Sequence, residues 1–317
     1  MTPPARILII ELSNIGDAIL TLPALSDLFQ AHPAAEIHML CSPRVADLFS
    51  KDPRVFRIWL WKKERSFVSQ AAFIFRLSLK WFNLVVDFRH SLIPFFLLGA
   101  KRAPILWRGS IALHRADRHL QVVRKMGIAP SSSGGSSLWI GQEDEREIRR
   151  FLSDRPLVVV SPGARSHLKR WPALAFAELA DRLIEEDKVQ VLLVGEVAER
   201  SIAREVAASM RHPVSDLSGQ TTFPQLAALL RKANLVITND SACLHTADAM
   251  GTPTVAIFGP TDPEKYGPRH PRAKVVRLRV VCAPCERALC PYQHECMRWL
   301  GTQEVYQAAK DILSGNS

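Results

Sequence analysis

The residues best suited to catalysis lie where short apolar runs end. Asp17 follows Gly16, shortly after the run Ile7–Ile10 and just before a segment with apolar residues at helical spacing. A carboxylate that lies close to a hydroxyl can remove its proton as a general base. A structural interpretation is also open, in which Asp17 caps the helix that follows and contributes about 0.5–2 kcal/mol to stability.

Loops in the second half of the chain carry a complementary set of residues. Glycines there let the backbone approach a ligand closely, and lysine and arginine can neutralise phosphate. A carboxylate four residues after Gly195 can accept hydrogen bonds from ribose hydroxyls, and a helix that opens near Ser241 favours a bound diphosphate. Each residue alone has an ordinary structural interpretation, but together they predict a nucleotide-diphosphate pocket. Its predicted members are Gly163, Arg165, Ser166, Lys169, Glu199, Asp240, Ser241, Ala242 and His245.

Alternating strands and helices are expected to position both groups. Predicted strands include Ile7–Ile10, Leu84–Asp87 and Leu157–Ser161, and the first helix is predicted at Ala18–Gln30. Repeated alternation of this kind predicts an α/β protein with mostly parallel, doubly wound sheets. In such sheets ligands bind at the carboxyl ends of the strands, where the loops of both groups fall.

The length of the chain predicts two domains, because 317 residues exceed the usual size of a single core. The low-complexity segment Ser131–Ser137 is typical of a flexible break between domains. We place the first domain at residues 1–150 and the second at residues 151–302. Residues 303–317 are predicted to form a last helix that packs back on the first domain.

The charge and the apolar segments bound the functional class. A net charge of +10 indicates an anionic partner, but no RNA- or DNA-binding motif accompanies it, so nucleic acid is not expected. The first strand lacks a G-x-G-x-x-G turn, which argues against a dinucleotide-dependent dehydrogenase. The chain has neither a signal peptide nor about 18 uninterrupted apolar residues, so we expect a cytoplasmic protein. The most apolar segment, Leu92–Ala100, is expected to be buried, with a membrane-contacting patch as the alternative.

Five segments together resemble glycosyltransferase family 9, the lipopolysaccharide heptosyltransferases. They read LSNIGDAILTLPAL, SPGARSHLKRWP, VGEVAER, NDSACLH and FGPTDP, and the resemblance covers nearly the whole chain. It implies a GT-B architecture, in which two Rossmann-like domains face a central cleft. It also implies an ADP-heptose donor, a growing lipopolysaccharide core acceptor, inversion at the anomeric carbon and no cofactor for catalysis.

The resemblance also implies roles for particular residues. Asp17 matches the catalytic base of the family, and Lys169 matches its phosphate-binding lysine. Glu199 matches the acid that contacts the ribose. The diphosphate cradle at a helix start matches Asp240, Ser241 and Ala242, with His245 behind it, and some members have Thr and Gly in place of Ser241 and Ala242.

The acceptor is expected to bind the first domain. A lipid A–core oligosaccharide carries phosphates and acidic sugars in an anionic inner-membrane surface, which fits the basic charge and predicts peripheral membrane association. Two interpretations stay open beside heptosyl transfer: a transferase with another nucleotide sugar, and a non-catalytic GT-B scaffold. The predicted contacts to acceptor or lipid are Ser13, Asn14, Gly16, Arg102, Arg108, Arg115 and Arg118.

Four cysteines near the C-terminus follow the pattern C-x2-C-x4-C-x5-C. They are Cys282, Cys285, Cys290 and Cys296. Such close thiols in a cytoplasmic chain suggest a structural zinc ion or an iron–sulfur cluster, in which His294 could replace one thiol. Disulfides and free thiols are the alternatives. The cluster follows the nucleotide loops in the sequence, so no catalytic role is expected for it.

Overall fold

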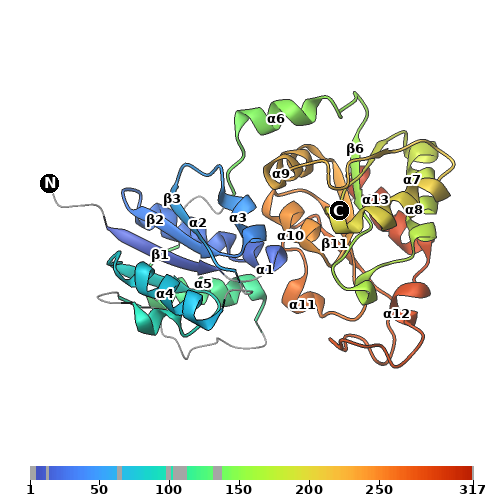
Figure 1. Cartoon of the computed structure of the whole chain (residues 1–317). Helices are drawn as coiled ribbons and strands as arrows, with labels where there is room; N and C mark the ends of the chain where they lie inside the picture. The colour runs from blue at the N-terminus through green and yellow to red at the C-terminus, as the bar shows by residue number, and fades with distance from the viewer. Residues whose placement is uncertain are drawn as a thin grey trace. The chain divides into compact units, whose positions relative to one another are not determined.

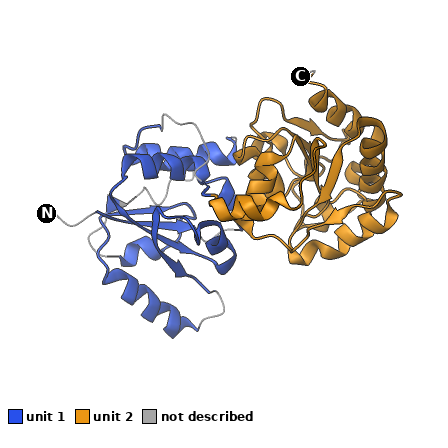
Figure 2. Cartoon of the chain, turned by 90° about the horizontal axis from the view of Figure 1, so that it is seen from above, with its two compact units in different colours: residues 1–139 blue, residues 140–317 orange. Residues whose placement is uncertain are grey.

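The computed structural model describes residues 5–11, 14–62, 66–97, 101–102, 113–130 and 138–315. The chain divides into two compact units, Met1–Trp139 and Ile140–Ser317 (Figure 2). The predicted boundary after residue 150 was therefore about ten residues too late. The helix Gln142–Arg149 belongs to unit 2, because its buried Ile148 joins a core cluster of that unit. Ser131–Ser137 lies outside the described residues.

Unit 1 is built on a five-stranded sheet in the order β3-β2-β1-β4-β5. All of its strand pairs are parallel, as the alternation of strands and helices predicted. Its elements are β1 (Arg6–Glu11), α1 (Ile15–Ile19), α2 (Leu22–Ala31), β2 (Glu36–Cys41), α3 (Pro43–Phe49), β3 (Val55–Leu60), α4 (Phe67–Ser78), β4 (Leu84–Asp87), η1 (Ile93–Phe96), β5 (Lys101–Arg102) and α5 (Arg115–Lys125).

The single helix predicted at Ala18–Gln30 is two helices, α1 and α2. Pro23 stands in the first turn of α2, and its nitrogen has no hydrogen to donate to the preceding turn. The hydroxyl of Thr21 donates to the carbonyl of Ala18 at 2.6 Å and so completes the end of α1. Asp17 consequently lies in the first turn of a five-residue helix, with Asn14 at its N-cap.

Unit 2 is built on a six-stranded parallel sheet in the order β11-β10-β9-β6-β7-β8 (Figure 1). Its elements are α6 (Gln142–Arg149), β6 (Leu157–Ser161), η2 (His167–Lys169), α7 (Ala173–Asp187), β7 (Gln190–Leu193), η3 (Val197–Glu199), α8 (Arg200–Ser209), β8 (Ser215–Asp216), α9 (Phe223–Lys232), β9 (Leu235–Asn239), α10 (Ala242–Ala249), β10 (Thr254–Ile257), α11 (Pro263–Tyr266), β11 (Lys274–Val276), α12 (Glu295–Arg298) and α13 (Thr302–Leu313).

Helices cover both faces of the unit 2 sheet. Alternate residues of β6 point to opposite sides, so Val158 packs with α7, α8 and α13, whereas Val159 packs with α9 and α10. This double cover explains why β6, β9 and β10 are buried along their whole length rather than at alternate residues.

The last helix packs within unit 2, which corrects the expectation that it returns to the first domain. Helix α13 contacts α7, β9, β10 and β11. Tyr306 of α13 is almost fully buried, and its hydroxyl donates to the carboxylates of Glu186 and Asp187 at 2.9 and 3.0 Å. Because α13 buries its apolar stripe on this sheet, that stripe is not available to another surface. No helix in the described part of the chain is long and apolar enough to span a bilayer.

Candidate active site

The loop after β6 approaches Glu199 at Gly163. A Cβ atom placed on Gly163 would lie 2.3 Å from the Glu199 carboxyl carbon and 2.6 Å from each of its oxygens. No larger residue fits there without displacing the carboxylate. The sequence predicted both residues as parts of one pocket, and the structure brings them together.

The carboxylate of Glu199 accepts a backbone hydrogen bond, and its burial disfavours the charged form. The backbone N–H of Glu196 donates to Glu199 Oε2 at 2.9 Å. Burial raises the pKa of Glu199, while this hydrogen bond and the nearby Arg170 act in the opposite direction. A Cβ atom on Gly195 would contact both Glu199 Oε2 and Ser218 Oγ. The carboxylate therefore lies between two glycines, with a serine hydroxyl at the edge of the same space.

Lys169, Asp240 and His245 form the polar centre of unit 2. Lys169 Nζ lies 2.6 Å from Asp240 Oδ2, and His245 Nε2 lies 3.7 Å from Asp240 Oδ1. The Asp240 side chain is 4% exposed, whereas that of Lys169 is 31% exposed. An ammonium group has three N–H donors, so the bond to Asp240 leaves Lys169 further donors toward solvent or a ligand.

Helix α10 begins beside this centre. Ser241 is its N-cap residue, but the Ser241 side chain makes no capping hydrogen bond and lies 3.1 Å from Thr238 Oγ1. Ala242 is the first helical residue. The first N–H groups of an eight-residue helix therefore have no side-chain cap, and they suit an anion.

Asn239, at the end of β9, holds the loop that follows β6, a role that the sequence analysis did not assign. Its Nδ2 donates to the carbonyl of Pro162 at 2.8 Å, and its Oδ1 accepts the backbone N–H of Trp171 at 3.0 Å. The side chain is fully buried at the end of β9. The position of Asn239 in the NDSA segment, where a strand ends before a helix, was the available signal.

Arg165 and Ser166 are less closely tied to this centre. Arg165 is exposed, and Ser166 is the half-buried residue before η2. The neighbouring Arg170 holds the loop in shape, because its Nε donates to the carbonyl of Ala164 at 2.8 Å.

Thr261 is a further residue that the sequence analysis left unassigned. It lies in the FGPTDP segment after β10, at the same edge of the sheet as the start of α10. Its Oγ1 is buried and has no hydrogen-bond partner among the described residues. Buried hydroxyls nearly always find a partner, so an unsatisfied one at this edge is suited to a polar ligand.

In unit 1, Asp17 is accessible and lies near a cation. Its side chain is 29% exposed, and Asp17 Oδ2 lies 3.9 Å from Arg89 Nη1. The buried carboxylate of Asp87 shapes the loop that carries Arg89, since it accepts the backbone N–H groups of Arg89 and Ser91 at 2.8 and 2.6 Å. Burial raises the pKa of Asp87. Sequence reasoning placed Asp87 at a strand exit but did not assign Arg89.

Further basic groups gather around His119 on α5. Burial lowers the pKa of His119 to about 3, and the charges of Arg115, Arg118 and Arg89 act in the same direction. All three arginines thus lie within electrostatic reach of His119, two of them on α5 and Arg89 in the loop after β4. Among the other predicted acceptor contacts, Asn14 and Gly16 flank the start of α1. Ser13, Arg108 and the side chain of Arg102 lie outside the described residues.

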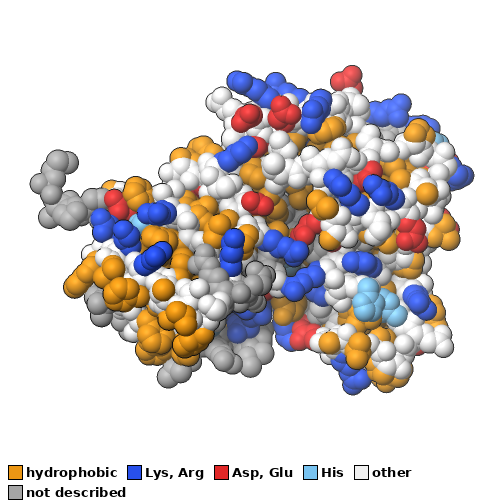
Figure 3. Space-filling view, in the orientation of Figure 1, with side chains coloured by type: hydrophobic (Ala, Val, Ile, Leu, Met, Phe, Trp, Pro, Cys, Tyr) orange, Lys and Arg blue, Asp and Glu red, His pale blue; other side chains and the backbone are white. Residues whose placement is uncertain are grey.

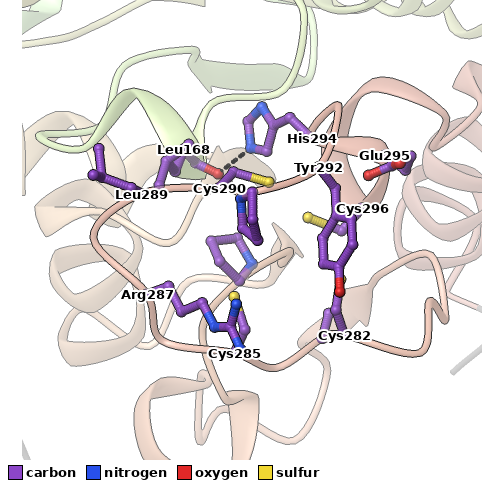
Figure 4. Close-up of a pocket in the computed structure, with 13 residues that line it drawn as sticks. Leu168, Cys282, Cys285, Arg287, Leu289, Cys290, Tyr292, His294, Glu295 and Cys296 are labelled. Carbon is purple, nitrogen blue, oxygen red and sulfur yellow. Dashed lines mark hydrogen bonds between the residues drawn. The ribbon is translucent and has the colours of Figure 1, made fainter.

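The four C-terminal cysteines line one pocket (Figure 4). All of them are free thiols. Burial raises the pKa of Cys296 to about 11, and the proximity of the other three thiols contributes. No three Cys, His, Asp or Glu side chains in the described part of the chain are arranged to hold a metal ion.

Residues of the cysteine pocket contact two loops of the candidate site, the one after β6 and the one after β10. The backbone N–H of Cys285 donates to the carbonyl of Pro260 at 3.0 Å, and His294 Nε2 lies 2.5 Å from the carbonyl of Leu168. Leu168 directly precedes Lys169 in the chain. Figure 4 shows the contact between His294 and Leu168 at the rim of the pocket.

Two solved structures share the fold over nearly the whole chain. A glycosyltransferase family 9 protein from Veillonella parvula DSM 2008 aligns with a TM-score of 0.84 and 22% identity, covering 99% of each chain. The Escherichia coli ADP-heptose lipopolysaccharide heptosyltransferase II aligns with a TM-score of 0.78 and 22% identity, covering 98% of this chain and 99% of that one. The two α/β units, each built on a parallel sheet, thus form the GT-B fold of glycosyltransferases.

Sequence comparison defines the family. The profile of glycosyltransferase family 9 (heptosyltransferase) matches residues 61–295. Lipopolysaccharide heptosyltransferase 2 of Salmonella typhimurium is 28% identical over 310 residues, which cover 86% of this chain and 88% of that relative. The chain therefore belongs to glycosyltransferase family 9, as its motifs predicted.

Proposed function

We propose that this glycosyltransferase moves heptose from ADP-heptose to the inner core of lipopolysaccharide, with inversion at the anomeric carbon. The observation that carries the proposal is the cluster of Lys169, Asp240 and the uncapped start of α10, which can bind a diphosphate. The names of the relatives supply the donor and the acceptor, since the Escherichia coli neighbour is described as an ADP-heptose lipopolysaccharide heptosyltransferase.

In the proposed donor site, each group contacts one part of ADP-heptose. The Glu199 carboxylate, which lies against the backbone of Gly163, accepts hydrogen bonds from the ribose hydroxyls. Lys169 and the N–H groups at the start of α10 hold the diphosphate. Thr261, whose hydroxyl has no partner among the described residues, donates to the diphosphate or the sugar.

In the proposed reaction, Asp17 removes the proton of the acceptor hydroxyl as its oxygen attacks the anomeric carbon. The bond between that carbon and the β-phosphate oxygen breaks, and ADP leaves with the electron pair. Preorganised donors such as Lys169 and the α10 N–H groups stabilise the charge that develops on ADP, typically by about 3–4 kcal/mol for one such donor. Attack from the face opposite ADP inverts the configuration.

The acceptor is proposed to bind unit 1 through its acidic groups. Arg89, Arg115 and Arg118 all lie within electrostatic reach of His119, and their guanidinium groups can pair with phosphate or carboxylate. A cytoplasmic enzyme that associates peripherally with the inner membrane would meet this acceptor where it is anchored.

The proposal is tested by measuring transfer to a heptose-free core acceptor with a panel of nucleotide sugars. ADP-heptose is expected to give product and ADP, while the UDP and GDP sugars give none. Turnover with a UDP sugar and not with ADP-heptose would contradict the assignment of the donor.

For the cysteine pocket, we propose a structural metal bound by Cys282, Cys285, Cys290 and Cys296. The spacing of the thiols and their shared pocket support it, although the thiols must draw together around the ion. Metal analysis of the purified chain is expected to find about one zinc per chain, or about two to four irons for an iron–sulfur cluster. The Cys285→Ser/Cys290→Ser variant is expected to lose that metal, and a metal-free native chain would contradict the proposal.

A further inference from the structure

Helix α4 of unit 1 is apolar on two sides. Its inner side, including Leu77, packs on the sheet together with Phe73. Its outer side presents further large apolar residues at spacings of seven and four, from Val68 through Phe75 to the C-cap residue Leu79. A helix that is apolar all round is ordinarily buried on all sides, so the outer side of α4 is suited to a partner.

The exposed apolar residues of α4 continue onto η1, which packs against it. Figure 3 shows hydrophobic side chains gathered over α4 at the lower left. We call these residues the α4 face; each of them is between 54% and 86% exposed. The α4 face consists of Phe67, Val68, Phe75, Leu79, Phe95 and Phe96.

The charged side chains that α4 and the residues just after it carry are positive. Arg76 and Lys80 are exposed on and just after α4, and neither forms an ion pair within the described part of the chain. From Ser66 to Val86 the sequence contains no aspartate or glutamate. Trp81, which is 65% exposed, follows Lys80, and tryptophan is enriched where a membrane meets water.

We propose that the α4 face docks on the surface of an anionic lipid bilayer. Large apolar and aromatic side chains that enter the acyl boundary, next to lysine and arginine that pair with acidic headgroups, are the features of helices that lie in a membrane interface. A second copy of this chain fits less well. A symmetric contact would set the α4 face against itself and bring two sets of unpaired cations together.

The position of α4 connects docking to the proposed reaction. In the parallel register, Leu60 at the end of β3 aligns with Cys41, and Cys41 aligns with Glu11 at the end of β1. Helix α4 begins shortly after β3, and Asp17 follows β1, so Phe67 and Asp17 both follow strands at the same edge of the sheet. This inference rests on the proposed function in one respect: a lipid-anchored acceptor would reach Asp17 from the membrane that the α4 face touches.

The test measures sedimentation of the full chain with vesicles of phosphatidylcholine alone or mixed with phosphatidylglycerol. The native chain is expected to bind the anionic vesicles and to bind neutral vesicles at least about tenfold more weakly. Phe67→Ser/Phe75→Ser is expected to lower binding to anionic vesicles at least tenfold. Arg76→Gln/Lys80→Gln is expected to remove most of the preference for anionic lipid.

Matched controls lie on unit 2. Leu174→Ser/Val281→Ser removes two exposed apolar side chains, and Arg204→Gln/Lys232→Gln removes two exposed charges. Both controls are expected to bind vesicles as the native chain does. Because all the changes are at exposed positions, circular dichroism and the thermal midpoint are expected to stay unchanged, which separates lost docking from misfolding.

Three outcomes would overturn the inference: no binding of the native chain to anionic vesicles, equal binding by the α4-face variants, or a dimer in sedimentation velocity that Phe67→Ser/Phe75→Ser dissociates. Transfer to a soluble, deacylated acceptor separates this inference from the proposed function. The α4-face variants are expected to retain that activity. A native chain that binds vesicles but transfers nothing would overturn the function and leave the docking.

Discussion

At the scale of single residues, the centre of unit 2 pairs the buried carboxylate of Asp240 with Lys169, the cation proposed to bind phosphate. An acid beside a diphosphate is unfavourable on its own, but Asp240 is matched by Lys169 at 2.6 Å. The pair holds the flexible lysine side chain in one position before the nucleotide arrives, so less conformational freedom is lost on binding. Asp240 is therefore best understood as the group that positions Lys169.

Glu199→Gln is expected to weaken ADP binding about 10- to 100-fold, because a charged acceptor of ribose hydrogen bonds becomes a neutral one. Burial raises the pKa of Glu199, so the folded state holds its proton more tightly than the unfolded state. The contribution of Glu199 to the free energy of unfolding is fully present below the pKa that its carboxyl has in the unfolded chain. It is lost as pH rises through the raised pKa of the folded chain. The variant should consequently unfold no more easily than the native chain at neutral pH.

Calorimetric titration with ADP and urea unfolding check this prediction. The native affinity should fall as pH is lowered through the raised pKa of Glu199, whereas the affinity of Glu199→Gln should vary less over that range. Glu205→Gln, which removes an exposed carboxylate of α8, is the control. Native ADP affinity in Glu199→Gln would refute the assigned contact.

Arg89→Gln is expected to raise the KM for the acceptor about tenfold and to leave ADP affinity unchanged, since Arg89 belongs to the basic group of unit 1. Added salt should weaken acceptor binding of the native chain more than that of the variant. The exposed Arg44→Gln change is the control. Steady-state kinetics at two ionic strengths measure the KM for the acceptor. An unchanged KM in Arg89→Gln would exclude Arg89 from the acceptor site.

At the scale of elements, two asparagines at opposite ends of β9 hold β6 and the loop after it. Asn239 ties the Pro162 carbonyl and the Trp171 N–H at the carboxyl end. Asn234 accepts the backbone N–H of Leu157 at 2.8 Å at the amino end. The first contact positions the active-site loop, and the second only aligns the strands.

Asn239→Ala is expected to lower the free energy of unfolding by about 2–4 kcal/mol, because it leaves two buried backbone groups without partners. It should also weaken ADP binding, since the loop that carries Lys169 loses its tie. Asn234→Ala is the matched control: it should cost less stability, because Asn234 is exposed, and keep ADP affinity. Urea unfolding and calorimetry measure both quantities. Equal ADP affinities in the two variants would show that Asn239 has no positioning role.

Several elements were predictable from local patterns because a single physical cause dominates them. The helices Pro43–Phe49 and Phe223–Lys232 begin with Ser42 and Thr222, whose side chains accept from the third helical N–H, and each has a proline in its first turn. In contrast, Leu92–Ala100, which was expected to be buried, is buried only in part where it is described. Ile93 and Leu97 are buried, while Phe95 and Phe96 are exposed, because the short 3-10 turn at η1 divides the apolar run between two sides.

At the scale of the whole molecule, the GT-B fold predicted from the sequence is confirmed, while the nucleotide-binding roles of the candidate residues stay predictions. Glu199, Gly163, Lys169 and Asp240 could be recognised because each directly follows a strand or opens a helix, and parallel sheets gather such positions at one edge. The surface on which α13 packs could not be predicted, because an amphipathic pattern shows that a helix has an apolar side to bury but not which sheet covers it. Arg89 was not assigned because its position near Asp17 depends on two segments far apart in the sequence, and Thr261 because only the structure shows that its hydroxyl is buried without a partner among the described residues.

The proposed reaction requires a catalytic base from unit 1, Asp17, and a donor site from unit 2. The most direct measurement compares native protein with Asp17→Asn for transfer from ADP-heptose and, separately, for ADP binding. The account predicts that transfer by the variant falls about 10²- to 10⁴-fold while its ADP affinity stays native. Near-native transfer by Asp17→Asn would contradict it.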